Sequence, residues 1–191
     1  MKNTLFTSLF ILLLCIFGIT PLDGQVNLNE ERFAFEPELK YEEQIPAPNK
    51  VLGYELGETF TIYAHVVDYL KQLTAASPRI TMAKYGETYE KRPLYYLIIT
   101  SEENQTKIES IRKNSVDLAN FTATNEQEFK NLIDNHPVVV SYSYNIHGNE
   151  ASSTEAAMQV AYRLAATNDT ETKDLLKNTV FILYPCINPD G

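Results

Sequence analysis

The sequence predicts an α/β protein, and two parts of the chain carry that prediction. Residues 80–100 hold two strand-like runs separated by turn residues, which is typical of an antiparallel hairpin. Residues 137–146 and 179–187 are apolar runs of the kind found in buried strands, and a helical pattern of small side chains lies between them. Strand, helix and strand in this order form a βαβ unit with parallel strands. We therefore expect a mixed sheet flanked by helices.

The N-terminal segment 1–24 has the pattern of a secretory signal peptide. Lys2 precedes an apolar run from Leu5 to Ile19, and small or turn-forming residues follow it. The run is shorter than the roughly 20 residues that span a bilayer, so we expect no stable membrane anchor. Lipidation at Cys15 is disfavoured by the bulky Leu14 before it. We therefore expect a secreted or periplasmic protein.

Residues 25–50 are rich in Glu, Pro and Asn and show no sustained period. We expect them to form an extended lead-in, in which Pro46 and Pro48 break any helix. The folded domain is expected to occupy residues 51–191. The chain stops at a turn directly after a predicted buried strand, so we expect the domain to be truncated at its C-terminus.

Local patterns predict the first elements of this domain. Apolar residues recur at helical spacing over residues 59–76, with Thr59 as the capping residue. Residues 80–85 and 94–100 are the strands of the hairpin. A helical connection follows at residues 105–113.

The second half of the domain is expected to hold the βαβ unit. A short helix capped by Thr124 or Asn125, with Glu128 three or four residues on, precedes the Val-rich strand at 137–146. That strand is expected to be buried on both faces. The crossover helix begins at residue 150 or 151 and runs to about Ala166, before the second strand.

Charge and cysteine content exclude two kinds of interaction. The formal net charge of -9, with a pI near 4.8 and no Lys/Arg cluster, disfavours nucleic acid as a partner. Once the signal peptide is removed, Cys186 is the only cysteine in this span, so no intrachain disulfide can form there. Its apolar neighbours predict a small buried side chain.

An imidazole and a carboxylate stand three residues apart directly after the strand at 137–146. Residues three apart share one helix face, so His147 and Glu150 can aim at one point. Zinc binds His nitrogen and carboxylate oxygen at about 2.0 to 2.2 Å, and a catalytic site has three protein ligands and an open position. We expect His65 on the first helix to be at the surface or satisfied by hydrogen bonds, and not a ligand, and we expect His136, in a loop, to be solvated. The pair therefore predicts two of the three ligands of a zinc site.

Two further segments flank this motif in order. Residues 85–93 read Tyr-Gly-Glu-Thr-Tyr-Glu-Lys-Arg-Pro before a strand, and residues 188–191 read Asn-Pro-Asp-Gly after one. Together with His147-Gly148-Asn149-Glu150 they resemble the zinc carboxypeptidase family, the metallopeptidases of the carboxypeptidase A type. The resemblance runs from about Gly53 to Gly191.

The resemblance implies a mixed, mostly parallel twisted sheet flanked by helices, of which this chain holds the N-terminal half. It implies one Zn²⁺ ion held by His147 and Glu150 and by a third ligand beyond residue 191. The general base is also expected there, so no catalytic residue is assigned within 1–191. The implied reaction is hydrolysis of C-terminal peptide bonds by metal-activated water, with a peptide or protein as substrate.

Two alternatives remain open. Asn149 stands where digestive members of the family carry an arginine, and His-Gly-Asn-Glu also resembles the motif of zinc deacylases that act on N-acyl amino acids. A non-catalytic binding module with the same fold is the other alternative. Because the third ligand and the base are expected downstream, we predict that the 191-residue chain binds zinc weakly and hydrolyses nothing. Side-chain specificity and oligomeric state are left open.

Overall fold

The computed structural model describes residue 36, residues 38–120 and residues 125–191. The signal peptide expected at 1–24 and the alternative cap Thr124 lie outside these residues. The helices are α2 Pro48–Leu52, α3 Tyr63–Ala76, α4 Glu102–Thr106, α5 Ile108–Asn120, α6 Glu126–Asn135, α7 Ala151–Ala166 and α8 Thr170–Asn178, and the strands are β1 Ile80–Glu87, β2 Pro93–Ile99, β3 Val138–Ser143 and β4 Thr179–Tyr184. In the described part of the chain, no helix is long and apolar enough to cross a bilayer.

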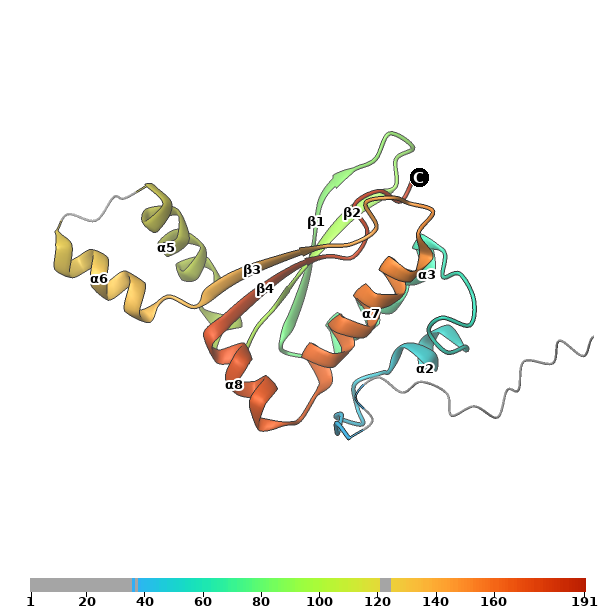
Figure 1. The fold of residues 1–191 in the computed structure, drawn as a ribbon, viewed down its shortest axis with the longest axis horizontal. Helices are drawn as coiled ribbons and strands as arrows, with labels where there is room; N and C mark the ends of the chain where they lie inside the picture. The colour runs from blue at the N-terminus through green and yellow to red at the C-terminus, as the bar shows by residue number, and fades with distance from the viewer. Residues whose placement is uncertain (1–35, 37, 121–124) are drawn as a thin grey trace, which may run out of the picture. The chain divides into compact units, whose positions relative to one another are not determined.

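One sheet carries all four strands, in the order β1-β2-β4-β3 (Figure 1). Strand β2 pairs antiparallel with β1 on one side and with β4 on the other. Strands β3 and β4 run parallel, with Val139 opposite Val180. The predicted mixed α/β sheet, the hairpin and the parallel βαβ pair are therefore confirmed. Two of the three pairings are antiparallel, so this part of the sheet is less parallel than expected.

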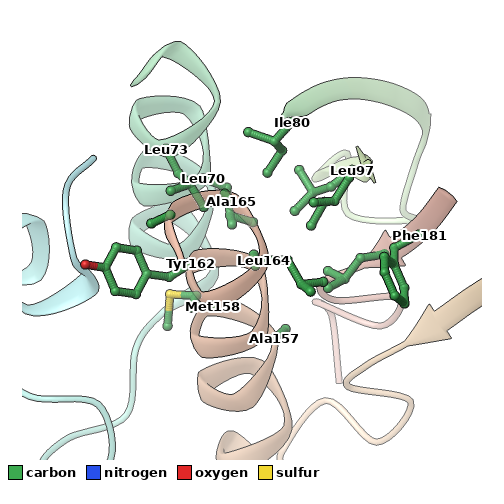
Figure 2. Close-up of a cluster of buried hydrophobic side chains, with 14 of the residues drawn as sticks. Leu70, Leu73, Ile80, Leu97, Ala157, Met158, Tyr162, Leu164, Ala165 and Phe181 are labelled. Carbon is green, nitrogen blue, oxygen red and sulfur yellow. The ribbon is translucent and has the colours of Figure 1, made fainter. Parts of the chain in front are cut away.

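The core lies between the sheet and helices α3 and α7, which cover one face of it (Figures 1 and 2). Helix α7 presents Ala157, Ala161 and Ala165 at four-residue spacing, and all three are fully buried. Small side chains at this spacing lie on one face of a helix, so α7 can approach the strands closely. Leu97 of β2 and Leu183 of β4, which are partners across the sheet, belong to the same buried cluster.

Strand β3 is far more exposed than its Val-rich sequence predicts. The side chains of Val138 and Val139 are 63% and 42% exposed. Among the described strands, β3 lies at the edge of the sheet and has β4 as its one neighbour, whereas α7 packs over β2 and β4. Within the described residues, β3 is not buried on both faces as predicted, because it has one neighbouring strand there, whereas β4 lies between β2 and β3 and is buried.

Helix α3 begins three residues later than predicted, and Thr59 does not cap it. Its N-cap residue is Ile62, which makes no side-chain capping bond. Ahead of the helix, the buried Glu155 carboxylate of α7 accepts hydrogen bonds from the backbone N–H groups of Thr61 at 3.1 Å and Gly57 at 3.4 Å. This carboxylate holds the preceding segment in a loop against α7.

The last residues of the expected lead-in pack onto the domain. Ile45 is buried in the core, and the Tyr41 ring stacks on Tyr162 of α7 with centroids 4.7 Å apart. Pro48 begins helix α2 and does not break it, since the first helical position needs no N–H donor. The packed chain therefore starts several residues before Val51.

Helix α8 was not predicted from the sequence, although a capping signal is present. The Asp169 side chain accepts a hydrogen bond from the Thr172 backbone N–H at 2.8 Å, which is the geometry of an N-cap. The cap predicted for α6 is confirmed in the same way, because Asn125 accepts from the Glu128 backbone N–H at 2.8 Å.

Candidate metal centre

The candidate site lies where the two parallel strands end. Residues 144–150, here called the ligand loop, connect β3 to the first turn of α7, and residues 185–191 follow β4. The two segments are joined by main-chain hydrogen bonds from Tyr144 N to Tyr184 O, 2.9 Å, and from Ile187 N to Tyr144 O, 3.1 Å. Such crevices at the carboxyl ends of strands are where α/β sheets bind ligands.

The structure brings the two predicted ligands together on this loop. His147 Nδ1 lies 3.1 Å from Glu150 Oε1, and the side chains are 70% and 62% exposed. A main-chain hydrogen bond from Glu150 N to His147 O, 3.0 Å, closes the turn that aligns them. An exposed pair of this kind adds little to stability.

The spacing of these two atoms suits a shared metal ion. Two ligand atoms that each lie about 2.0 to 2.2 Å from a tetrahedral zinc ion are separated by roughly 3.3 Å, close to the distance seen here. Imidazole nitrogen with carboxylate oxygen is a ligand set that zinc accepts. Within the described ranges, no group of three or more His, Cys, Asp or Glu side chains is placed to hold a metal ion. The residues present therefore fit part of a zinc site.

Gly148 allows the ligand loop to touch the turn that follows β4. A Cβ atom at this position would lie 2.5 Å from Asn188 O and from the Cα of Gly191, so a larger residue could not be accommodated. The Asn188 side chain also donates from Nδ2 to Ile146 O at 3.1 Å. The turn at 188–191 thus supports the ligand loop from one side.

Asp190 joins this turn to the hairpin between β1 and β2. Its carboxylate accepts a hydrogen bond from Glu90 N at 3.0 Å and forms an ion pair with the Arg92 guanidinium. Partial burial disfavours ionisation of Asp190, but the bonds from Glu90 and Arg92 outweigh it, so the pKa of the carboxyl lies below its ordinary value. The three sequence segments that resemble the family meet at this point.

Sequence reasoning missed the pairing of Arg92 with Asp190. Both residues lie within segments that were singled out, at 85–93 and 188–191, so their charges were a usable signal. Which of the other charged residues in the hairpin would face the turn depends on strand register, and the sequence alone does not give it.

A cavity of about 590 Å³ opens beside the ligand loop. Its walls are mainly apolar, from the start of α3, and Arg92 and Asn145 contribute polar atoms. The hydroxyl of Tyr63 in this wall donates to Pro93 O at 2.6 Å, and burial raises the pKa of that phenol well above its ordinary value. His147 and Glu150 are not part of the lining.

The other residues considered in the sequence have structural roles. His65 is exposed, as predicted. His136 is half-buried, and its Nε2 lies 3.0 Å from Ser115 Oγ and 3.1 Å from Ile111 O, so the prediction of a solvated ring is wrong. Cys186 is buried as predicted, and burial raises the pKa of its thiol.

The tyrosines near the strand ends are mainly packing residues. The Tyr184 ring meets Tyr85 edge to face with centroids 5.4 Å apart, and Tyr96 lies 6.0 Å away. Tyr142 stacks on Phe181 at 5.9 Å. Aromatic pairs at these distances stabilise a sheet face.

Several solved structures resemble part of this chain, and two of them serve as examples. The carboxypeptidase A of Helicoverpa armigera matches with 21% sequence identity and a TM-score of 0.48, covering 75% of this chain and 31% of that structure. Thrombin activatable fibrinolysis inhibitor matches with 17% identity and a TM-score of 0.46, covering 70% of this chain and 26% of that structure. This chain thus spans about a quarter to a third of the length of these structures. No curated protein sequence matches it.

A family model described as zinc carboxypeptidase matches residues 66–191. The matched range is more than half of the chain and contains the ligand loop and the turn at 188–191. The chain therefore belongs to the zinc carboxypeptidase family.

Proposed function

We propose that the protein is a zinc-dependent carboxypeptidase that hydrolyses C-terminal peptide bonds, with His147 and Glu150 as two of its metal ligands. The observation that carries this proposal is the 3.1 Å approach of His147 Nδ1 to Glu150 Oε1 in a chain of the zinc carboxypeptidase family. The exposure of both side chains leaves their ligand atoms open to an ion and a substrate.

In this proposal, the described residues bind the metal ion and hold the ligand loop in place. His147 and Glu150 would hold the ion through an imidazole nitrogen and a carboxylate oxygen. When bound, zinc polarises a carbonyl group and lowers the pKa of water towards about 7. Gly148 lets the ligand loop lie against the turn at 188–191, and Asp190 ties that turn to the hairpin. We assign the third ligand and the general base to the part of the domain beyond residue 191.

We further propose that the protein is exported and acts on peptides or proteins outside the cytoplasm. The support is the pattern of the segment 1–24, with its apolar run after Lys2. N-terminal sequencing of the mature protein tests this, because removal of the segment is expected.

The experiment for the central proposal compares His147→Ala with His65→Ala in the complete protein. Both changes remove an exposed imidazole, but only His147 lies on the ligand loop. We expect His147→Ala to lose bound zinc and release of C-terminal amino acids together, while His65→Ala keeps both. Unchanged zinc content in His147→Ala would remove that residue from the site.

The same assay separates the alternatives. The exposed Asn149 offers a neutral amide next to the ligands, and a neutral amide polarises a substrate carbonyl less than an arginine does. Release of free amino acids from N-acyl amino acids, without cleavage of peptides, would favour a deacylase. Zinc binding without either reaction would favour a non-catalytic module.

A further inference from the structure

Asn145 occupies an unusual place at the start of the ligand loop. It follows β3 closely in the chain, is 6% exposed, and has a φ of 57°, in the left-handed region. Asparagine is one of the few side chains that adopt this conformation readily. A buried amide must also find hydrogen-bond partners, since an unpaired polar group is destabilising in the interior.

The partners of Asn145 are the elements that define the site. Its backbone N–H donates to Ser153 Oγ of α7 at 2.7 Å. Its side-chain amide lies 3.1 Å from His147 O and 3.3 Å from Glu150 O, the carbonyl groups of the two candidate ligands. With its NH₂ group turned toward these carbonyls, the amide donates to both, and its other end faces Cys186 Sγ at 2.9 Å.

We infer that Asn145 is the positioning residue of the metal centre, which fixes the backbone of His147 and Glu150 relative to each other. The inference rests on the proposed zinc function. The amide bridges the two ends of the four-residue turn at 147–150. Among the described residues, one main-chain hydrogen bond lies within this turn, from Glu150 N to His147 O. Its contacts to Ser153 and Cys186 tie that turn to α7 and to the segment after β4.

A simpler role for Asn145 is to supply a left-handed turn residue and nothing more. Glycine adopts the same backbone conformation without a side chain, so Asn145→Gly separates the two roles. Asn145→Asp keeps the shape but replaces the NH₂ donor with an oxygen facing two carbonyls. Lys91→Gly is the matched control, because Lys91 is exposed and also has a positive φ, of 66°.

The first readout is the zinc affinity of the complete protein, measured by competition with a chromophoric chelator. We expect Asn145→Gly to bind zinc about 10- to 100-fold more weakly, the usual effect of removing a group that orients metal ligands. Asn145→Asp is expected to lose at least as much, and Lys91→Gly to lose nothing. An unchanged affinity in Asn145→Gly would overturn the positioning role.

The second readout needs no metal and separates this inference from the proposed function. Amide hydrogen exchange at Glu150 and Ser153 should become faster in Asn145→Gly, while exchange at the core residue Leu97 stays as it was. Equal acceleration at all three would mean general destabilisation and would contradict the inference. If the unmodified complete protein fails to bind zinc, the proposed function fails, and the exchange result still decides the role of Asn145.

Discussion

Helix α7 and the ligand loop that precedes it differ in how much of their side chains is buried. Along helix α7, Ala157, Ala161 and Ala165 are fully buried in the core. Just before the helix, the side chains of His147 and Glu150 are 70% and 62% exposed. The packed part therefore stabilises the fold, whereas the ligand loop provides the candidate metal ligands and contributes little to stability. Substitutions in the packed part should therefore lower the free energy of unfolding, whereas substitutions in the ligand loop should weaken zinc binding with little change in stability.

The largest effect on stability is expected in the packed region. Leu97→Ala removes a fully buried side chain from β2 and should lower the free energy of unfolding by about 2–5 kcal/mol. Val138→Ala, on the exposed edge strand β3, should change it by less than about 0.5 kcal/mol. Urea denaturation followed by circular dichroism measures both. Equal losses for the two variants would contradict the burial seen here.

A smaller effect is expected at Glu155, which lies on α7 but bonds the loop ahead of α3. Glu155→Ala leaves the Thr61 N–H without its acceptor and should destabilise the fold by about 1–3 kcal/mol. Glu155→Gln should lose less, because an amide oxygen can still accept. If both variants unfold at the same denaturant concentration as the unmodified chain, the hydrogen bond from Thr61 N to Glu155 does not stabilise the fold.

Asp190 joins the turn that supports the ligand loop to the β1–β2 hairpin, and its contribution to stability should depend on pH. Its folded-state pKa lies below the ordinary value of 3.8, so the ionised carboxylate stabilises the fold above that value. This stabilisation is lost as the pH falls through the folded-state pKa. The stability difference between the unmodified chain and Asp190→Asn should be largest near neutral pH and should shrink in acid. Thermal melts over a pH series test this. A stability difference that grows in acid would contradict a lowered pKa of Asp190 in the folded state.

The smallest effect on stability, and the largest on chemistry, is expected on the ligand loop. Glu150→Ala removes an exposed side chain and should change the free energy of unfolding by less than about 0.5 kcal/mol. The same change should abolish metal retention. Zinc content and denaturation curves of one preparation check both expectations, and loss of stability without loss of zinc would break the comparison.

The sequence predicted the elements of this fold better than their surroundings. Patterns of apolar residues placed α7, β3 and β4, because these patterns are local. They did not distinguish the exposed β3 from the buried β4, since both are rich in apolar residues and only the sheet order separates them. Helix α8 is short and polar, so its cap was the only signal.

In the candidate site, contacts between residues close in sequence were predicted and contacts between distant residues were not. His147 and Glu150 are close in the chain, and their spacing alone predicted that they would approach each other. The bond between Arg92 and Asp190 joins residues far apart in sequence, and it depends on how the hairpin meets the turn. The role inferred for Asn145 depends on a backbone conformation and on burial, neither of which a residue type fixes.

The most direct test of the metal centre is a zinc titration followed by NMR of the side chains. We predict that the ring nitrogens of His147 and the carboxylate carbon of Glu150 shift together, with one apparent dissociation constant, while His65 and His136 do not respond. In the 191-residue chain that constant should indicate weak binding, since only two ligands were predicted here. Shifts at His65 or His136 with His147 and Glu150 unmoved would contradict the assignment.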